Sequence, residues 1–286
     1  FLGALIVSTD TNLDRLSTTW TTNWWTSLTG TSALTSSPHR FTSFSGAVII
    51  TDGRFINDYD NTIARDPALT LPVGFEARWS LVWQDLLFIG GANTVGQDAE
   101  IFTWRRGLSA PESRYPVGDT EAFCGFVIDV PYIITRKGEI KKFTGQGFDT
   151  VQQFPTVELN RNINFIHPNG VSVVGNVAKI FVDMGTSANM RELSGFWNFD
   201  AASRNLYHSG SVRNSTGNDY AQHEFPSLGV GALKFTNPSQ GYYLAGAQVY
   251  TDYPNTTRYG IFSSDETASS NRGYFITPKI PAKDAR

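Results

Sequence analysis

The stretch VIITDGRFI, residues Val48–Ile56, decides the fold class of this chain: an apolar run, a tight polar turn and a second apolar run follow one another directly. An Asp-Gly pair between two short apolar runs favours the positive φ angles of a tight hairpin turn. The same pattern returns in YIITRKGEI, residues Tyr132–Ile140. Both stretches therefore predict a pair of antiparallel β-strands.

Looser copies of this hairpin pattern recur along the whole chain. The central residues of the copies lie 33 to 45 residues apart, about 38 on average, and they are Val7, Ile49, Phe88, Ile133, Val173, Leu206, Tyr243 and Ile276. A β-repeat of roughly 40 residues has the length of one four-stranded propeller blade. Since no segment keeps a helical period for three turns, we predict an all-β chain with almost no helix.

The repeat length favours a β-propeller of seven blades, with six or eight as alternatives. An open ring of blades would leave two exposed sheet edges, so we expect the N- and C-terminal strands to pair and close the ring. The last strand, around Tyr274–Ile280, would then complete the blade begun by Leu5–Val7 and would be essential for stability. A β-sandwich, a pair of sandwiches or a β-helix also has short strands and regular turns, and these folds stay as alternatives.

Length and composition limit the protein class. We expect a single domain, residues 1–286, with a longer parent chain as an alternative because the sequence opens on Phe1 without an initiator Met. Only 17% of the residues are charged and the net charge is -3, which argues against nucleic-acid binding. The one cysteine, Cys124, excludes an intramolecular disulfide, and its apolar neighbours predict a buried, unreactive thiol. No apolar run reaches the roughly 18 residues of a membrane span.

The sequence contains no motif for catalysis, metal binding or cofactor binding. It has no Gly-x-Ser-x-Gly elbow and no His-Glu-x-x-His pair. Gly145–Gly147 and Gly229–Lys234 lack the strand–loop–helix context of nucleotide-binding loops and predict turns. The histidines lie beside turns, where hydrogen bonds to the backbone are the commoner role; they are His39, His167, His208 and His223. We therefore predict no catalytic residues, no metal and no cofactor, and the sequence leaves the binding residues undetermined.

Aromatic and basic residues carry a few weaker predictions. Three tryptophans lie in a stretch rich in Thr, Ser and Asn, namely Trp20, Trp24 and Trp25. Such rings can bind sugars, but we favour their packing between neighbouring blades. Arg105–Arg106 and Lys141–Lys142 are predicted to be exposed strand ends. The glycosylation-type motifs at Asn214 and Asn255 are interpreted as chance matches in an Asn- and Thr-rich chain.

Three segments resemble the blade sequences of β-propeller proteins encoded in the structural modules of tailed bacteriophages. They are SPHRFTSFSG at Ser37–Gly46, SGFWNFD at Ser194–Asp200 and RGYFITP at Arg272–Pro278. The resemblance implies a non-enzymatic virion component, such as a tail, nozzle or adhesion protein, whose propeller is a rigid platform for protein–protein interaction. It also implies assembly in the host cytoplasm, a place in the extracellular particle, and virion proteins as partners in a homo-oligomeric or ring-like assembly.

The alternative function is that of an extracellular carbohydrate-active propeller, either a sialidase-like glycoside hydrolase or a lectin. A hydrolase needs carboxylates that converge at the mouth of a central channel, whereas a scaffold can line the channel with neutral residues. A host-surface glycan is a further partner that the virion hypothesis also allows. Neither hypothesis predicts recognition of a nucleic-acid sequence or a membrane span.

Overall fold

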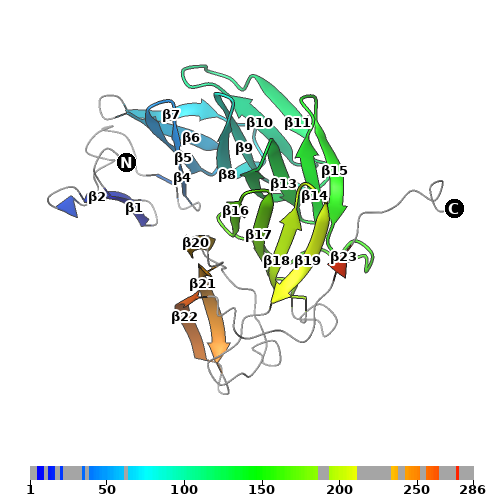
Figure 1. Ribbon diagram of the computed structural model, residues 1–286. Helices are drawn as coiled ribbons and strands as arrows, with labels where there is room; N and C mark the ends of the chain where they lie inside the picture. Colours follow the sequence, from blue (N-terminus) through cyan, green and yellow to red (C-terminus); the bar gives the residue numbers. More distant parts are fainter. Residues whose placement is uncertain are drawn as a thin grey trace. The chain divides into compact units, whose positions relative to one another are not determined.

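The computed structural model describes residues 5–9, 12–16, 20–21, 34–35, 39–60, 64–185, 193–210, 233–237, 242–251, 256–263 and 275–276. Side chains are described for residues 34–35, 39–60, 64–185 and 193–209. The chain divides into two compact units, Phe1–Gly125 and Phe126–Arg286. Every regular element in the described ranges is a β-strand (Figure 1), which confirms the all-β prediction.

The first unit contains three antiparallel sheets whose strands follow one another in chain order. The first sheet has three strands, β1 (Leu5–Thr9), β2 (Asn12–Leu16) and β3 (Trp20–Thr21). The second has four, β4 (Arg40–Phe44), β5 (Ala47–Asp52), β6 (Phe55–Tyr59) and β7 (Ala64–Thr70). The third also has four, β8 (Phe75–Trp83), β9 (Leu86–Asn93), β10 (Glu100–Trp104) and β11 (Ser113–Pro116).

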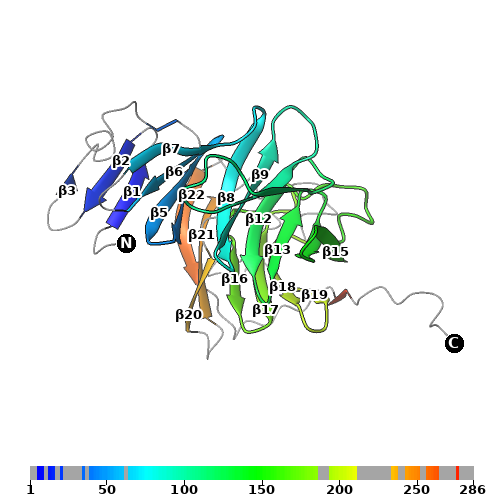
Figure 2. The same cartoon turned by 90° about the horizontal axis from the view of Figure 1, so that it is seen from above.

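The later sheets repeat this up-and-down order. β12 (Ala122–Val127) runs across the boundary of the units and leads into β13 (Pro131–Thr135), β14 (Glu139–Phe143) and β15 (Phe148–Gln153). The next sheet contains β16 (Val171–Val174), β17 (Val177–Val182), β18 (Gly195–Asp200), β19 (Asn205–Gly210) and, as a fifth strand, β23 (Phe275–Ile276). β20 (Leu233–Asn237), β21 (Tyr242–Thr251) and β22 (Thr256–Ser263) form a three-stranded sheet with a long β21–β22 hairpin (Figure 2).

The two stretches that predicted the fold, Val48–Ile56 and Tyr132–Ile140, are the central hairpins of their sheets. In both sheets, backbone N–H groups of the chain that follows the fourth strand donate to carbonyl groups in the turn of that hairpin. The matching bonds are Leu71 N to Arg54 O (2.8 Å) and Phe154 N to Gly138 O (2.8 Å), then Ala77 N to Gly53 O (2.7 Å) and Ile163 N to Arg136 O (2.8 Å). The repeat read from the sequence is therefore also a repeat of hydrogen bonds.

Contacts between successive sheets involve their first strands. In the first unit, β4 and β5 both contact β8, the first strand of the next sheet. In the second unit, β16 contacts β20 in the same way, and the fourth strands β15 and β19 also meet. Meander sheets that contact one another through their first strands have the topology of successive propeller blades. The described strands form six sheets in all, and the predicted number of seven blades stays a prediction.

The prediction that the terminal strands pair is wrong. β23 pairs with β19, with Leu206 opposite Ile276 and Tyr207 opposite Phe275. β1 instead pairs with β2 through a short hairpin, with Thr9 opposite Asn12. The terminal strands thus belong to different sheets, because β23 has taken the edge of β19, which carries no proline and no carboxylate, lysine or arginine to discourage a further strand.

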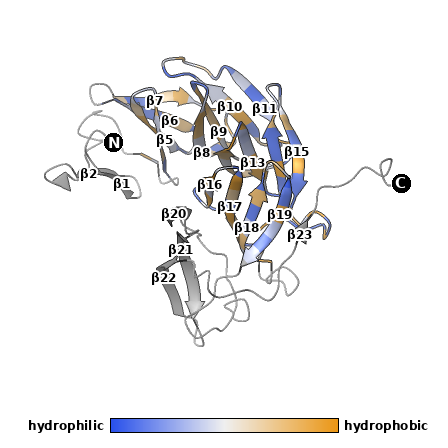
Figure 3. Ribbon diagram, viewed as in Figure 1, coloured by the Kyte–Doolittle hydropathy of each residue, from blue (hydrophilic) through white to orange (hydrophobic). Residues whose placement is uncertain are grey.

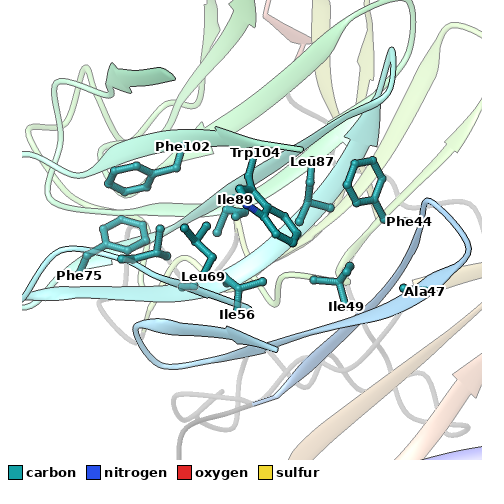
Figure 4. Close-up of a cluster of buried hydrophobic side chains, with 12 residues drawn as sticks. Phe44, Ala47, Ile49, Ile56, Leu69, Phe75, Leu87, Ile89, Phe102 and Trp104 are labelled. Carbon is teal, nitrogen blue, oxygen red and sulfur yellow. The ribbon is translucent and has the colours of Figure 1, made fainter. Parts of the chain in front are cut away.

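The second and third sheets enclose the main described core of the first unit. Figure 4 shows Ala47, Ile49 and Ile56 of one sheet pointing toward side chains of the other sheet, which include Leu87, Ile89, Phe102 and Trp104. The neighbours Val48 and Ile50 point to the opposite face and form a second cluster with Leu34 and Tyr59. Because the sheet is apolar on both faces, its central strand is a continuous apolar run rather than an alternating one.

The outermost strand β11 differs from the central strands. Three of its four residues are exposed and it is coloured mainly as hydrophilic in Figure 3. This gradient, from apolar central strands to a polar outer strand, indicates that the third sheet meets solvent at its outer edge.

A bulge in the third sheet requires a glycine at position 91. The register between β8 and β9 shifts at Arg78, so that Ala77 lies opposite Gly91 and Trp79 opposite Gly90. A Cβ atom at Gly91 would overlap the carbonyl oxygen of Glu76 and lie 2.8 Å from the backbone nitrogen of Arg78. Backbone atoms in a sheet cannot move aside as a flexible side chain can.

We predict that Gly91→Ala lowers the free energy of unfolding by about 2 kcal/mol, because it forces this bulge apart. Gly147→Ala is the matched control, since a Cβ atom there meets nothing within 4 Å. Urea unfolding followed by far-UV circular dichroism measures both. Equal midpoints for the two variants would contradict the assignment of the clash.

Cys124 is buried, with 0% of its surface exposed, and burial raises the pKa of its thiol far above the usual range. The prediction of a buried thiol is confirmed. Since the thiolate is the reactive form, we expect a bulky thiol reagent to label the native protein at most slowly and the urea-unfolded protein rapidly. Comparable labelling rates in the two states would show that the strand opens in the native protein.

Candidate functional site

A polar cluster of the first unit surrounds Asp58 on β6. Its carboxylate is fully buried and accepts hydrogen bonds from two arginines on different elements. Arg65 of β7 donates from Nε to Oδ1 at 2.9 Å, and Arg106, which follows β10, donates from Nε to Oδ2 at 2.9 Å. Asp58 therefore joins three segments of the chain around one buried charge.

Arg106 extends the cluster to a second carboxylate. Its Nη2 lies 2.5 Å from Oδ2 of Asp60, and its Nη1 donates to the carbonyl of Ser45 at 3.3 Å. Burial alone would lower the pKa of Arg106, but its hydrogen bonds to Asp60 and Asp58 outweigh burial and raise that pKa. Two cations and two anions make the cluster neutral, which is the arrangement expected of a structural clamp between strands.

The prediction that Arg105 and Arg106 are both exposed strand ends holds for one of them. Arg105 is 59% exposed and lies 3.5 Å from Glu112. Arg106 is only 16% exposed, because its guanidinium turns inward to the buried Asp58. Asp58 and Arg106 lie 48 residues apart, so no local pattern in the sequence could have revealed the pair.

A second polar cluster centres on Asp52, at the end of β5. Its carboxylate accepts hydrogen bonds from the backbone N–H of Thr35 at 3.0 Å and from the Thr35 hydroxyl, and Nε2 of His39 lies 3.3 Å from Oδ1. Burial alone would raise the pKa of Asp52, but the hydrogen bonds from His39 and Thr35 hold it below its usual value. Asp52 thereby anchors the segment that leads into β4.

Asp183 has the equivalent place in the second unit, directly after β17. It accepts from Nδ2 of Asn164 at 2.6 Å and from the backbone N–H of Gly185 at 2.8 Å. The backbone N–H groups of Asn164 and Phe165 also donate to its carbonyl, each at 3.1 Å. A buried aspartate at the end of the second strand thus holds the segment that leads into the first strand of the sheet, once in each unit.

The three described histidines all have structural contacts. His39 faces Asp52, and Nδ1 of His167 accepts from the backbone N–H of Asn169 at 3.1 Å. His208 is buried against Trp197, with 5.3 Å between the ring centroids, and its Nε2 lies 3.3 Å from the carbonyl of Ser194. His223 lies outside the described residues. Within the described part of the chain, no group of three metal-binding side chains comes together.

The second unit carries a cluster of Asp129, Tyr132 and Lys142 beside the β12–β13 hairpin. Asp129 accepts from the Tyr132 hydroxyl at 3.0 Å and from Nζ of Lys142 at 2.7 Å. The hydrogen bond between Lys142 and Asp129 raises the pKa of Lys142 and lowers that of Asp129. The aromatic ring of Tyr132 stacks on Phe126 with 5.4 Å between centroids. The cluster ties the hairpin to β14.

Lys141 and Lys142 differ in exposure, as Arg105 and Arg106 do. Lys142 is partly exposed, whereas Lys141 is buried on the other face of β14, with Nζ 3.1 Å from Glu139. The prediction of two exposed strand ends is therefore wrong for Lys141. Successive residues of a strand point to opposite faces, so two adjacent lysines cannot share one environment.

The remaining sequence candidates are either turns or lie beyond the described side chains. Gly145 and Gly147 form the β14–β15 turn, in which Thr144 N donates to Gly147 O at 2.9 Å, as predicted. The last two residues of Gly229–Lys234 open β20, and Trp20 opens β3, but their side chains are not described. Trp24, Trp25, Asn214 and Asn255 lie outside the described residues.

No protein-family model and no curated protein matches the chain. Among solved structures, it is similar to the computationally designed Ika8 protein, with a TM-score of 0.51 and 12% identity over 86% of this chain. The chain spans 65% of that protein, which is less than two thirds of its length.

Two further structures match over most of the chain. The first is the CNH domain of AfRom2, with a TM-score of 0.48 and 10% identity, covering 91% of this chain and 81% of that one. The second is the WD40 domain of SCAP from fission yeast, with a TM-score of 0.37 and 10% identity, covering 92% of this chain and 74% of that one. At these sequence identities the likeness concerns the fold alone.

In the described part of the chain, no helix has the length and apolar character needed to cross a membrane.

Proposed function

We propose that this chain is a non-enzymatic structural or attachment protein of a bacteriophage particle, a rigid β-propeller platform in the tail or a tail-associated assembly. Seven blades fit the repeat best, with six or eight as alternatives. Its partners are other virion proteins, and its place is the extracellular particle after assembly in the host cytoplasm.

The observation that carries this proposal is that the buried carboxylates bind donor groups of the protein itself. Asp52, Asp58 and Asp183 each accept two or more hydrogen bonds from the protein, and each is joined in this way to a segment distant in the sequence. A catalytic carboxylate must keep room for a substrate and a proton to reach it. Carboxylates whose two oxygens are both engaged by donors of the protein itself stiffen a sheet, and stiffness is what a platform requires.

Composition and sequence resemblance support the assignment to a phage particle. The resemblance of Ser37–Gly46, Ser194–Asp200 and Arg272–Pro278 to phage propeller blades points to a virion. The low content of charged residues, 17%, gives a largely uncharged polar surface that suits a protein packed against many neighbours. The contacts between the first strands of successive sheets support the topology of a propeller, a fold whose edges and loops offer broad contact surfaces.

Localisation in purified particles tests the proposal. An antiserum raised against residues 1–286 should label the tail region of particles produced from the genome that encodes the chain, as seen by immunogold electron microscopy. A chain found only in the soluble fraction of the host, with no signal in purified particles, would overturn it. An antiserum against a host cytoplasmic protein provides the control for carry-over.

Carbohydrate assays separate the proposal from its alternative. Under the proposal the purified chain hydrolyses neither a fluorogenic sialoside nor other glycosides. Saturable turnover of such a substrate would replace the platform by the hydrolase. Binding to a glycan array without turnover, together with absence from the particle, would replace it by the lectin.

A further inference from the structure

The fourth strands of the three four-stranded sheets, β7, β11 and β15, carry residues that discourage the addition of a further strand. β7 carries Arg65, Asp66 and Pro67; β11 carries Arg114 and Pro116; and β15 carries Asp149. Charged side chains and prolines on an edge strand discourage pairing with another strand, because a charge must be desolvated and a proline lacks an N–H donor.

β19, the fourth strand of the next sheet, has no such protection. Its residues Asn205–Gly210 read NLYHSG and include no proline and no carboxylate, lysine or arginine. His208 is buried against Trp197 and does not guard the edge. This is also the sheet that has taken up a fifth strand, β23 at Phe275–Ile276. An unguarded edge and an added strand are two independent observations of the same property.

We propose that the edge of β19 is a β-strand acceptor, and that in the assembled particle its occupant is the Phe275–Ile276 segment of a second copy of this chain. The same segment forms the same backbone hydrogen bonds whichever copy supplies it, so exchange between copies costs only the loss of the intramolecular tether. The partner is therefore the chain itself, joined through its C-terminal segment.

The tether sets the concentration at which exchange occurs. Residues 211–274 separate β19 from β23, and only two residue pairs hold β23 in place. Short flexible linkers reach an effective concentration of about 1 mM, and we take this value as the threshold for exchange here, where the connection includes β20, β21 and β22. Copies packed side by side in a particle exceed that concentration, and dilute copies do not. This step rests on the proposed function, since the particle provides the crowding.

Cysteines placed across the β19–β23 pair test the exchange. Tyr207 and Phe275 lie directly opposite each other, close enough for a disulfide between antiparallel strands. One preparation carries Tyr207→Cys alone and another carries Phe275→Cys alone, so mixing them allows a bond at this edge only between two copies. The buried Cys124 stays in place. Arg114→Cys on the guarded edge β11, mixed with Phe275→Cys, is the matched control.

The mixed preparations should give a disulfide-linked dimer whose fraction rises at least fivefold between roughly 10 µM and 1 mM, and the control mixture should not. No dimer at 1 mM, or equal dimer in the control, overturns the exchange. Adding Ile276→Pro to the Phe275→Cys chain leaves the body of the protein unchanged and should abolish the dimer; a dimer that persists also overturns it. Dimer formation by a chain that is absent from particles would uphold the acceptor edge and reject the proposed function.

Discussion

Replacing Trp104 by Ala lowers the free energy of unfolding of this protein by about 4 kcal/mol, the largest effect that we expect from a single substitution. Trp104 is fully buried on β10, between the second and third sheets. Its ring lies 6.4 Å from that of Phe44, and its Nε1 donates to the carbonyl of Leu108 at 2.8 Å. Alanine removes the ring that fills the space between the sheets and leaves this carbonyl without its donor.

Trp104→Phe separates these two losses. Phenylalanine keeps most of the apolar surface and loses the N–H group, so it should cost about 1–2 kcal/mol. Urea unfolding followed by far-UV circular dichroism gives both free energies. If Trp104→Ala shifted the midpoint no more than Trp104→Phe, the indole would not be the main contact between these sheets.

Replacing Asp58 by Ala is expected to cost about 3 kcal/mol, the second largest effect. The substitution leaves the buried part of Arg106 with one carboxylate, Asp60, in place of two, and it removes the partner of Arg65. The value lies at the lower end of the range for broken buried pairs, because Arg65 is 37% exposed and can turn to water.

Glu112→Ala provides the control for this prediction. It breaks the neighbouring pair with the exposed Arg105, and a surface ion pair of this kind contributes at most about 1 kcal/mol. Once Asp58 is gone, adding Arg106→Ala should cost less than Arg106→Ala costs in the native protein, since the contact between the two side chains is already lost and only those of Arg106 with Asp60 and Ser45 remain. Fully additive losses in the double variant would mean that Asp58 and Arg106 do not stabilise the protein through their mutual contact.

The hairpins of this fold could be predicted because their signals are local. In Val48–Ile56 the Asp-Gly turn and the two apolar runs are adjacent in the sequence, and the structure pairs Asp52 with Phe55 across that turn. The burial of Cys124 was predictable for the same reason, since its neighbours in β12 are apolar. Turn chemistry and the period of a strand depend on residues that lie a few positions apart.

The polar clusters could not be predicted because their members are distant in the sequence. Arg105 and Arg106 are indistinguishable in a sequence, and only the position of Asp58, brought near by the packing of two sheets, makes one of them a buried clamp. Lys141 and Lys142 are separated by the pleat of β14 in the same way. Composition predicts which groups are charged, while packing decides which of them are buried.

By itself the sequence determined an all-β chain of short meander sheets, with hairpins at the repeated stretches and a buried cysteine, because each of these follows from local apolar patterns and turn residues. Tertiary structure alone decided which edge receives the last strand and how the buried carboxylates are neutralised. Leu206 and Ile276 are paired although 70 residues separate them, and the expected pairing of the two chain ends does not form. A strand carries the same hydrogen-bonding groups toward any edge, so its partner is selected by which edges stay unguarded and by the entropy of the loop that must close.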